Sequence, residues 1–177
     1  MLVLSPILLI IAVAIKLDSK GPVLFKQKRV AKGKEHFQIL KFRTMYADVP
    51  KDVPTHLLAD PESKITKIGR FLRKSSLDEL PQIWNILVGE MSIIGPRPAL
   101  WNQFDLIAER DKYGANDVRP GLTGLAQVMG RDELPIEVKA KYDGEYAQNV
   151  TFANDVKIFF KTITSVLGAK GVKEGKQ

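Results

Sequence analysis

The sequence predicts an α+β fold, mostly helical, in which a small β-hairpin and amphipathic helices surround one domain behind an apolar N-terminal helix. Three observations predict this class. Residues 2–15 form an apolar run, the stretches 23–30 and 37–44 have the character of two strands, and apolar residues then recur at helical spacing. The chain of 177 residues is long enough for one domain with a real core and a small appendage.

The N-terminal run is apolar apart from Ser5 and Pro6, and it ends at Lys16. It is shorter than the roughly 20 residues that a helix needs to span a bilayer. Pro6 breaks or kinks a helix, and the hydroxyl of Ser5 can satisfy backbone groups that such a break frees. We therefore expect a re-entrant helix that enters a membrane without crossing it. A signal peptide and a buried core helix are the alternatives.

The composition excludes several kinds of functional site. The chain has no cysteine, which excludes disulfides, thiol catalysis and cysteine metal sites, and its two histidines lie too far apart in sequence for zinc-ligand spacing. The net charge is +7. Basic clusters of this kind favour nucleic acid, anionic lipid headgroups or phosphorylated substrates as partners. The clusters are Lys16, Lys20, Lys26, Lys28, Arg29, Lys32 and Lys34, then Lys64, Lys67, Arg70, Arg73 and Lys74.

The two predicted strands are joined through 31–34, which suggests a hairpin. Side chains alternate along a strand, so Lys41 and Arg43 share one face, which is either exposed to solvent or binds an anion. The polar segment 46–62 contains three prolines and is longer than ordinary connections, which predicts a functional lid or a mobile loop.

Four further helices are predicted, three of them from apolar spacing. They cover a basic stretch around 65–72, a stretch around 100–108 that Gly114 ends, the polar stretch 136–148, and an amphipathic stretch 152–167. The last of these has an apolar stripe that can pack in a core or lie at a membrane interface. Between them, 118–124 reads as a tight, exposed turn that holds Arg119.

The stretch 75–98 contains three candidate functional residues. Asp78 and Glu79 stand just before Pro81, which predicts a helix that starts near Asp78 and ends at Gly89. The start of a helix favours a phosphate group or a carboxylate poised beside one, although Asp at this place is also an ordinary cap. Arg97 stands between two prolines, and such a stiff frame lets its guanidinium bind carboxylate or phosphate at low entropy cost.

Five blocks in this order resemble one family, the bacterial sugar transferases, which are monotopic polyprenol-phosphate phosphoglycosyl transferases. The blocks are SPILLIIAVAIKLDSKGPVLFKQKRV, KFRTM, SSLDELPQIWNILVGEMSIIGPRP, VRPGLTGLAQVMGR and DVKIFFKTI. The resemblance implies an enzyme on the cytoplasmic face of the bacterial inner membrane. Its members transfer a phosphosugar from a UDP-sugar to undecaprenyl phosphate, release UMP and need Mg²⁺. They begin the synthesis of exopolysaccharide, capsule, O-antigen or glycoprotein glycans, with downstream glycosyltransferases as candidate partners.

The resemblance also implies roles for individual residues. Asp78 matches the family's nucleophile, and Glu79 matches its partner, with both near the metal. Ser5 and Pro6 match the break in the membrane helix. Diphosphate chemistry needs positive charge, for which Arg97 and Arg119 are the best candidates, with Lys41 and Arg43 behind them.

The family also predicts how the chain is divided. The implied division is a membrane helix at 1–17 and a cytoplasmic catalytic domain at 18–168, and the polar residues 169–177, with three lysines, predict a disordered tail. Only residues 1–4 precede the break, where the family carries a longer basic, aromatic and apolar stretch. We therefore expect that the true start lies upstream or that the first arm of the helix is missing. Selection of the sugar is assigned to 46–62 and 132–149.

Two other functions compete with this one. A catalytically silent membrane scaffold would use the same basic surface to hold anionic lipid, but it would have no need of Asp78, Glu79 and Arg97. A nucleic-acid-binding domain is suggested by charge alone. Base-stacking aromatic residues are sparse among the basic runs, so no nucleic-acid partner is expected.

Overall fold

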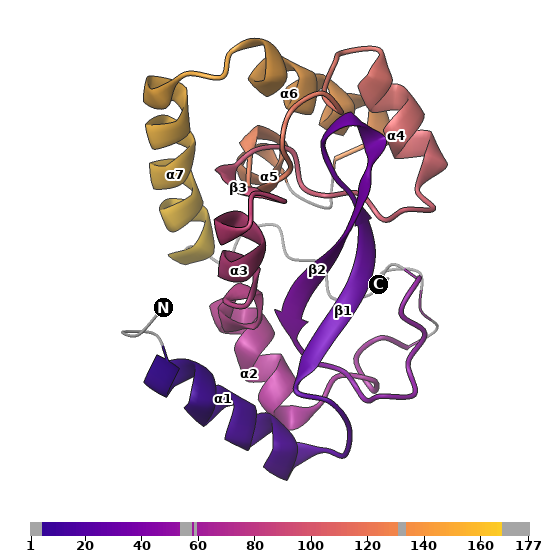
Figure 1. Cartoon of the computed structure of the whole chain (residues 1–177), viewed down its shortest axis with the longest axis vertical. Coiled ribbons are helices and arrows are strands. Elements are labelled where there is room, and N and C mark those ends of the chain that lie inside the picture. The colour runs from indigo at the N-terminus through magenta and orange to yellow at the C-terminus, as the bar shows by residue number, and fades with distance from the viewer. Residues whose placement is uncertain (1–4, 54–57, 59, 131–133, 168–177) are drawn as a thin grey trace. The chain divides into compact units, whose positions relative to one another are not determined.

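A computed structural model describes residues 5–53, 58, 60–130 and 134–167 (Figure 1). The helices are α1 Ser5–Asp18, α2 Lys67–Ser75, α3 Gln82–Leu87, α4 Phe104–Asp111, α5 Leu125–Met129, α6 Ile136–Gln148 and α7 Phe152–Leu167. The strands are β1 Leu24–Val30, β2 His36–Phe42, β3 Ser92–Ile94 and β4 Gly121–Thr123. The described residues also contain two one-turn 3-10 helices, η2 Lys32–Lys34 and η4 Leu77–Glu79.

The chain folds as two compact units that are interleaved in sequence. The first comprises the described residues within 1–27 and 39–83, and the second those within 28–38 and 84–173. The β1–β2 hairpin therefore contributes to both. The sequence did not indicate this division. The functional boundaries predicted at 17 and 168 stay predictions, and the predicted tail lies outside the described residues.

The first unit is built on a small apolar core. Ile11 and Ile15 of α1 pack with Phe42 at the end of β2 and Leu72 of α2. The chain can approach closely here because α2 contains a glycine. A Cβ atom on Gly69 would lie 2.0 Å from the backbone oxygen of Thr44, so no larger residue fits without moving the backbone.

Helix α1 buries only one side. Ile11 and Ile15 are buried, whereas Leu9, Ile10, Val13 and Leu17 are at least half exposed. Among the described residues, no helix is long and apolar enough to cross a membrane. The predicted break falls at the first two residues of α1, and residues 1–4 lie outside the described part. The re-entrant helix therefore stays a prediction.

The second unit packs helices around a two-stranded parallel sheet, β3 and β4, in which Ser92 pairs with Gly121 and Ile94 with Thr123. Its core includes Ile94, Tyr146 of α6 and Ile158 of α7. Helix α6 packs against α4 and α5. A Cβ on Gly144 would meet Cβ of Tyr113 at 2.2 Å, so this glycine lets α6 approach the segment that follows α4.

Most predicted elements are confirmed, with boundaries shifted by a few residues. The hairpin and α2 lie where they were expected, and α6 and α7 match the predicted ranges. The exposed turn predicted at 118–124 is wrong. Residues 120, 121, 123 and 124 are buried, because Gly121–Thr123 forms β4 against a strand far away in sequence. Arg119 itself is exposed, as expected.

Candidate active site

The two adjacent carboxylates lie on η4, a single helical turn between α2 and α3. Ser76 adopts a left-handed conformation, φ 56°, and its N–H donates to the carbonyl of Arg73 at 3.1 Å, which ends α2. Leu77 and Leu80 then pack on the core of the first unit. These apolar anchors on either side hold Asp78 and Glu79 in the first turn of η4.

The predicted helix start at Asp78 needs a correction. The regular helix α3 begins at Gln82, and Asp78 lies within η4, whose N-cap is Ser76. Pro81 explains the delay, since it cannot donate a hydrogen bond to an earlier carbonyl, and the turn before it closes with 3-10 bonds. Asp78 is therefore not the N-cap of an α-helix.

Glu79 is held by a lysine from the hairpin. Nζ of Lys41 lies 2.7 Å from Oε1 of Glu79, and the two side chains are 15% and 21% exposed. A charge-assisted hydrogen bond that is mostly shielded from water is stronger than a surface ion pair and restricts the carboxylate to one orientation. Lys41 was predicted to bind substrate. The structure adds that it positions Glu79, while contact with substrate stays a prediction.

Arg43, the other basic residue predicted on this face, is buried at 5% exposure. Its three guanidinium nitrogens donate to the carbonyls of Ser19, Lys20 and Pro22 at 2.8, 2.7 and 2.7 Å. The side chain therefore fastens the turn that follows α1 to the end of β2. This geometry favours a structural role for Arg43, and its predicted contact with substrate stays untested.

The two carboxylates were also assigned to a metal ion. Within the described ranges, no cluster of three or more acidic, histidine or cysteine side chains could hold one. Mg²⁺ is commonly bound through one or two carboxylates, with substrate phosphates and water completing its shell. Asp78 and Glu79 adjoin in sequence and supply oxygen donors of that kind, so the donor set fits Mg²⁺ together with a phosphate-bearing substrate.

Arg97 and Arg119 lie on two loops of the second unit that touch through their backbones. The N–H of Gly95 donates to the carbonyl of Thr123 at 2.8 Å, and the N–H of Gly121 donates to that of Pro96 at 2.9 Å. A Cβ on Gly95 would lie 2.4 Å from the carbonyl oxygen of Arg119. Both arginine side chains are exposed beside buried prolines. The structure thus brings together two residues that the sequence placed in the same role.

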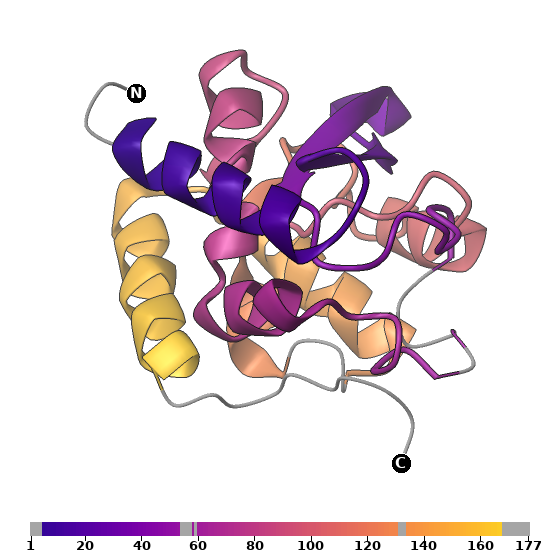
Figure 2. The ribbon, with the colours of Figure 1, turned by 90° about the horizontal axis from the view of Figure 1, so that it is seen from below.

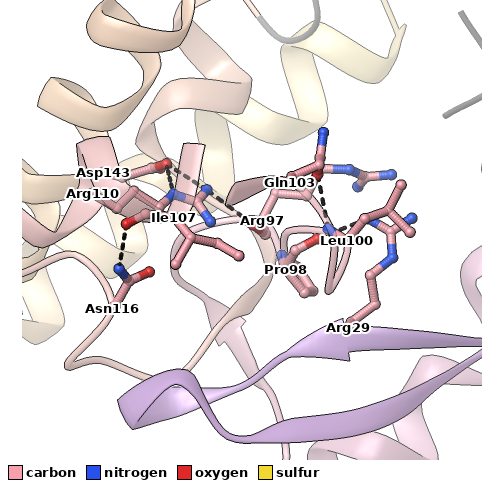
Figure 3. A network of polar contacts seen from close by, with 9 residues as sticks. All are labelled: Arg29, Arg97, Pro98, Leu100, Gln103, Ile107, Arg110, Asn116 and Asp143. Atoms are coloured by element: carbon pink, nitrogen blue, oxygen red, sulfur yellow. Dashed lines mark hydrogen bonds and ion pairs between the residues drawn. The ribbon is translucent and has the colours of Figure 1, made fainter. Parts of the chain in front are cut away.

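Sequence reasoning missed two charged residues behind the Arg97 loop. Arg110 of α4 and Asp143 of α6 form a buried ion pair, and Arg110 also donates to the carbonyl of Arg97 at 3.0 Å (Figure 3). Burial raises the pKa of Asp143, while the guanidinium of Arg110 opposes that shift. Leu106 and Ile107 precede Arg110 at helical spacing, and this pattern could have suggested that the arginine faces inward.

The chain is similar in sequence to known proteins. A family model described as "Bacterial sugar transferase" matches residues 1–169. A protein of Aeromonas hydrophila named UDP-N-acetylgalactosamine-undecaprenyl-phosphate N-acetylgalactosaminephosphotransferase is 40% identical over 175 residues, which cover 96% of this chain and 41% of that protein. The UDP-glucose:undecaprenyl-phosphate glucose-1-phosphate transferase of Caulobacter vibrioides is 42% identical over 172 residues, with 92% and 63% covered.

A shorter relative is covered over more of its length. The exopolysaccharide production protein ExoY of Rhizobium meliloti is 34% identical over 185 residues, which cover 97% of this chain and 81% of ExoY. In contrast, the chain spans between 38% and 41% of three of the larger curated relatives.

Proposed function

Because the chain belongs to the bacterial sugar transferase family, we propose that it transfers a phosphosugar from a UDP-sugar to undecaprenyl phosphate. The products are UMP and undecaprenyl-diphosphate-sugar. The observation that carries this proposal is the acidic pair of η4, in which Lys41 holds Glu79 beside Asp78. A scaffold that only held lipid would not need a carboxylate oriented in this way.

The transfer proceeds in two displacements at one carboxylate. An oxygen of Asp78 attacks the sugar-bearing phosphorus of the donor, so that an aspartyl O–P bond forms and the bond to UMP breaks. The phosphate of undecaprenyl phosphate then attacks the same phosphorus and releases Asp78. Splitting the reaction lets a soluble donor and a lipid acceptor use one site in turn, which predicts ping-pong kinetics.

Positive charge must offset the repulsion between the carboxylate and the diphosphate. Mg²⁺ held by Asp78 and Glu79 would supply part of that charge when bound. Arg97 and Arg119 supply the rest, since a guanidinium matches the geometry of phosphate oxygens. Glu79, held in place by Lys41, is suited to orient the metal and to handle protons.

The enzyme acts at the cytoplasmic face of the inner membrane, where its lipid acceptor lies, and starts a surface glycan that downstream glycosyltransferases extend. Exposed apolar side chains support this placement. Helix α7 runs along the outside of the second unit (Figures 1 and 2), and Phe152, Phe159 and Phe160 are 86%, 46% and 62% exposed. Ile158 of the same helix is buried at 1% exposure, so the aromatic face is not a core face.

Serine at both Phe159 and Phe160 is expected to weaken binding to phosphatidylglycerol-containing vesicles at least about tenfold, because two apolar side chains no longer enter the lipid. Co-sedimentation with vesicles measures the affinity. The matched control is Phe104→Ser, which removes a phenylalanine of α4 that is 69% exposed. Equal losses in the two variants would mean that α7 is not the membrane-facing helix.

Nucleotide release tests the proposed reaction. Detergent-solubilised protein is incubated with Mg²⁺, undecaprenyl phosphate and a panel of UDP-sugars. UMP released from one donor identifies the reaction and the sugar together. Release of UDP would mean glycosyl transfer without the phosphate and would refute the proposal. Silence with every donor would favour the lipid-binding scaffold.

A further inference from the structure

The loop that carries Arg97 rests on a buried ion pair. The side chains of Arg110 and Asp143 are 5% and 1% exposed. Nε and Nη2 of Arg110 donate to Oδ2 of Asp143 at 2.9 and 2.6 Å. Taking two charges out of water costs about as much as their attraction returns, so a pair of this kind contributes little net stability. The presence of this ion pair between α4 and α6 therefore needs an explanation other than stability.

The reason lies in a third hydrogen bond of the same guanidinium. Nη2 of Arg110 donates to the carbonyl oxygen of Arg97 at 3.0 Å (Figure 3). That carbonyl belongs to the residue whose side chain is exposed between two buried prolines. Asp143 fixes the guanidinium from the other side, so Arg110 cannot turn away from the loop. A bond from a charged donor is also stronger than one between neutral groups.

The neighbouring carbonyls of the loop are held as well. The N–H of Gly121 donates to the carbonyl of Pro96 at 2.9 Å, and Nη1 of Arg29 donates to that of Pro98 at 2.9 Å. Three consecutive carbonyls, 96–98, are thus bonded to three different segments of the second unit. The prolines also fix the backbone angle φ on each side of Arg97. The base of the Arg97 side chain is therefore rigid although the residue is exposed.

We propose that Arg110, with its charge balanced by Asp143, is a positioning residue for Arg97. It holds the backbone from which the exposed guanidinium of Arg97 reaches a phosphate of the nucleotide-sugar donor. This inference rests on the proposed function. Pre-ordering the base of a long side chain lowers the entropy cost of binding, and misplacement by about 1 Å can cost about 10²-fold in rate.

The test removes the ion pair without leaving a buried charge. The variant Arg110→Met/Asp143→Leu replaces both groups by apolar side chains, a change that buried ion pairs tolerate. It is compared in both the Arg97 and the Arg97→Ala backgrounds.

Lys34→Met is the matched control, because it removes the exposed ion pair of Asp111, the residue next to Arg110 on α4. Hydrogen exchange of the peptide 92–100 reports on the loop, and kcat and KM for the UDP-sugar report on the reaction.

We expect the pair variant to exchange faster at 92–100 and to lose about 10²-fold in kcat/KM. In the Arg97→Ala background the same change should cause almost no further loss, because Arg110 acts through Arg97. The inference is overturned if hydrogen exchange at 92–100 is unchanged in the pair variant. It is also overturned if the pair variant lowers kcat/KM by the same factor in the Arg97→Ala background as in the Arg97 background. A wild-type protein that releases no nucleotide from any donor refutes the proposed function instead, and the exchange comparison then decides alone whether Arg110 holds the loop.

Discussion

Asparagine at position 78 is expected to abolish UMP release, with a loss of at least about 10³-fold in kcat, because an amide oxygen cannot form the aspartyl–phosphorus bond. The change is nearly isosteric, and Leu77 and Leu80 continue to anchor η4. The melting temperature should therefore stay close to that of the wild type. Nucleotide release with the preferred donor measures the effect.

Asp117→Asn is the matched control for this prediction, since it neutralises an exposed aspartate elsewhere in the chain. It should keep nearly full activity. If Asp78→Asn kept more than a few per cent of the wild-type rate, Asp78 would not be the nucleophile. If both variants lost activity alike, the loss would reflect net charge rather than the chemistry of position 78.

Methionine at position 110 is expected to lower the free energy of unfolding by about 3–5 kcal/mol. The change leaves the carboxylate of Asp143 at 1% exposure without the guanidinium that compensates it. Burial already raises the pKa of this carboxyl, so the variant should take up a proton there. Urea denaturation measures the loss.

Two controls identify the cause of that loss. Adding Asp143→Leu to Arg110→Met should recover most of the stability, because no buried charge then remains. Lys34→Met breaks an ion pair whose side chains are 53% and 45% exposed, and it should cost no more than about 1 kcal/mol. A loss below about 1 kcal/mol for Arg110→Met would show that water reaches Asp143 and that the pair is not buried in solution.

The sequence predicted elements well where the signal is local. The bounds of α7 follow from its apolar spacing, and α6 matches a polar stretch that was predicted to be helical. Strand β4 was missed because its three residues pair with β3, and a partner some thirty residues earlier leaves no local pattern. The same non-local pairing explains why two arginine loops that are distant in sequence meet.

The face that a helix buries was harder to predict. In α3 the apolar residues Trp84 and Leu87 are 52% and 62% exposed, whereas Gln82 and Asn85 are buried at 1%. Asn85 donates to the carbonyl of Gln38 at 2.9 Å and to Glu90 at 2.7 Å. Apolar spacing locates a helix but does not distinguish a core face from one that meets another apolar phase.

The candidate site was predicted by residue type and corrected by geometry. The predicted site residues lie on exposed or half-buried turns, where packing of the fold does not require a polar side chain. They are Asp78, Glu79, Arg97 and Arg119. Arg43 looked similar in sequence, but its guanidinium is used by three backbone carbonyls. The roles of Arg110 and Lys41 as partners of other residues depend on contacts between remote segments, which the sequence does not display.

The most direct test of the central claim is the intact mass of the protein after reaction with the preferred UDP-sugar and Mg²⁺ in the absence of undecaprenyl phosphate. We predict an added mass of one phosphosugar on the peptide that contains Asp78, one equivalent of UMP released, and loss of the adduct when undecaprenyl phosphate is supplied. Steady release of UMP only with the lipid present, without any adduct, would show direct transfer between substrates and contradict the covalent mechanism.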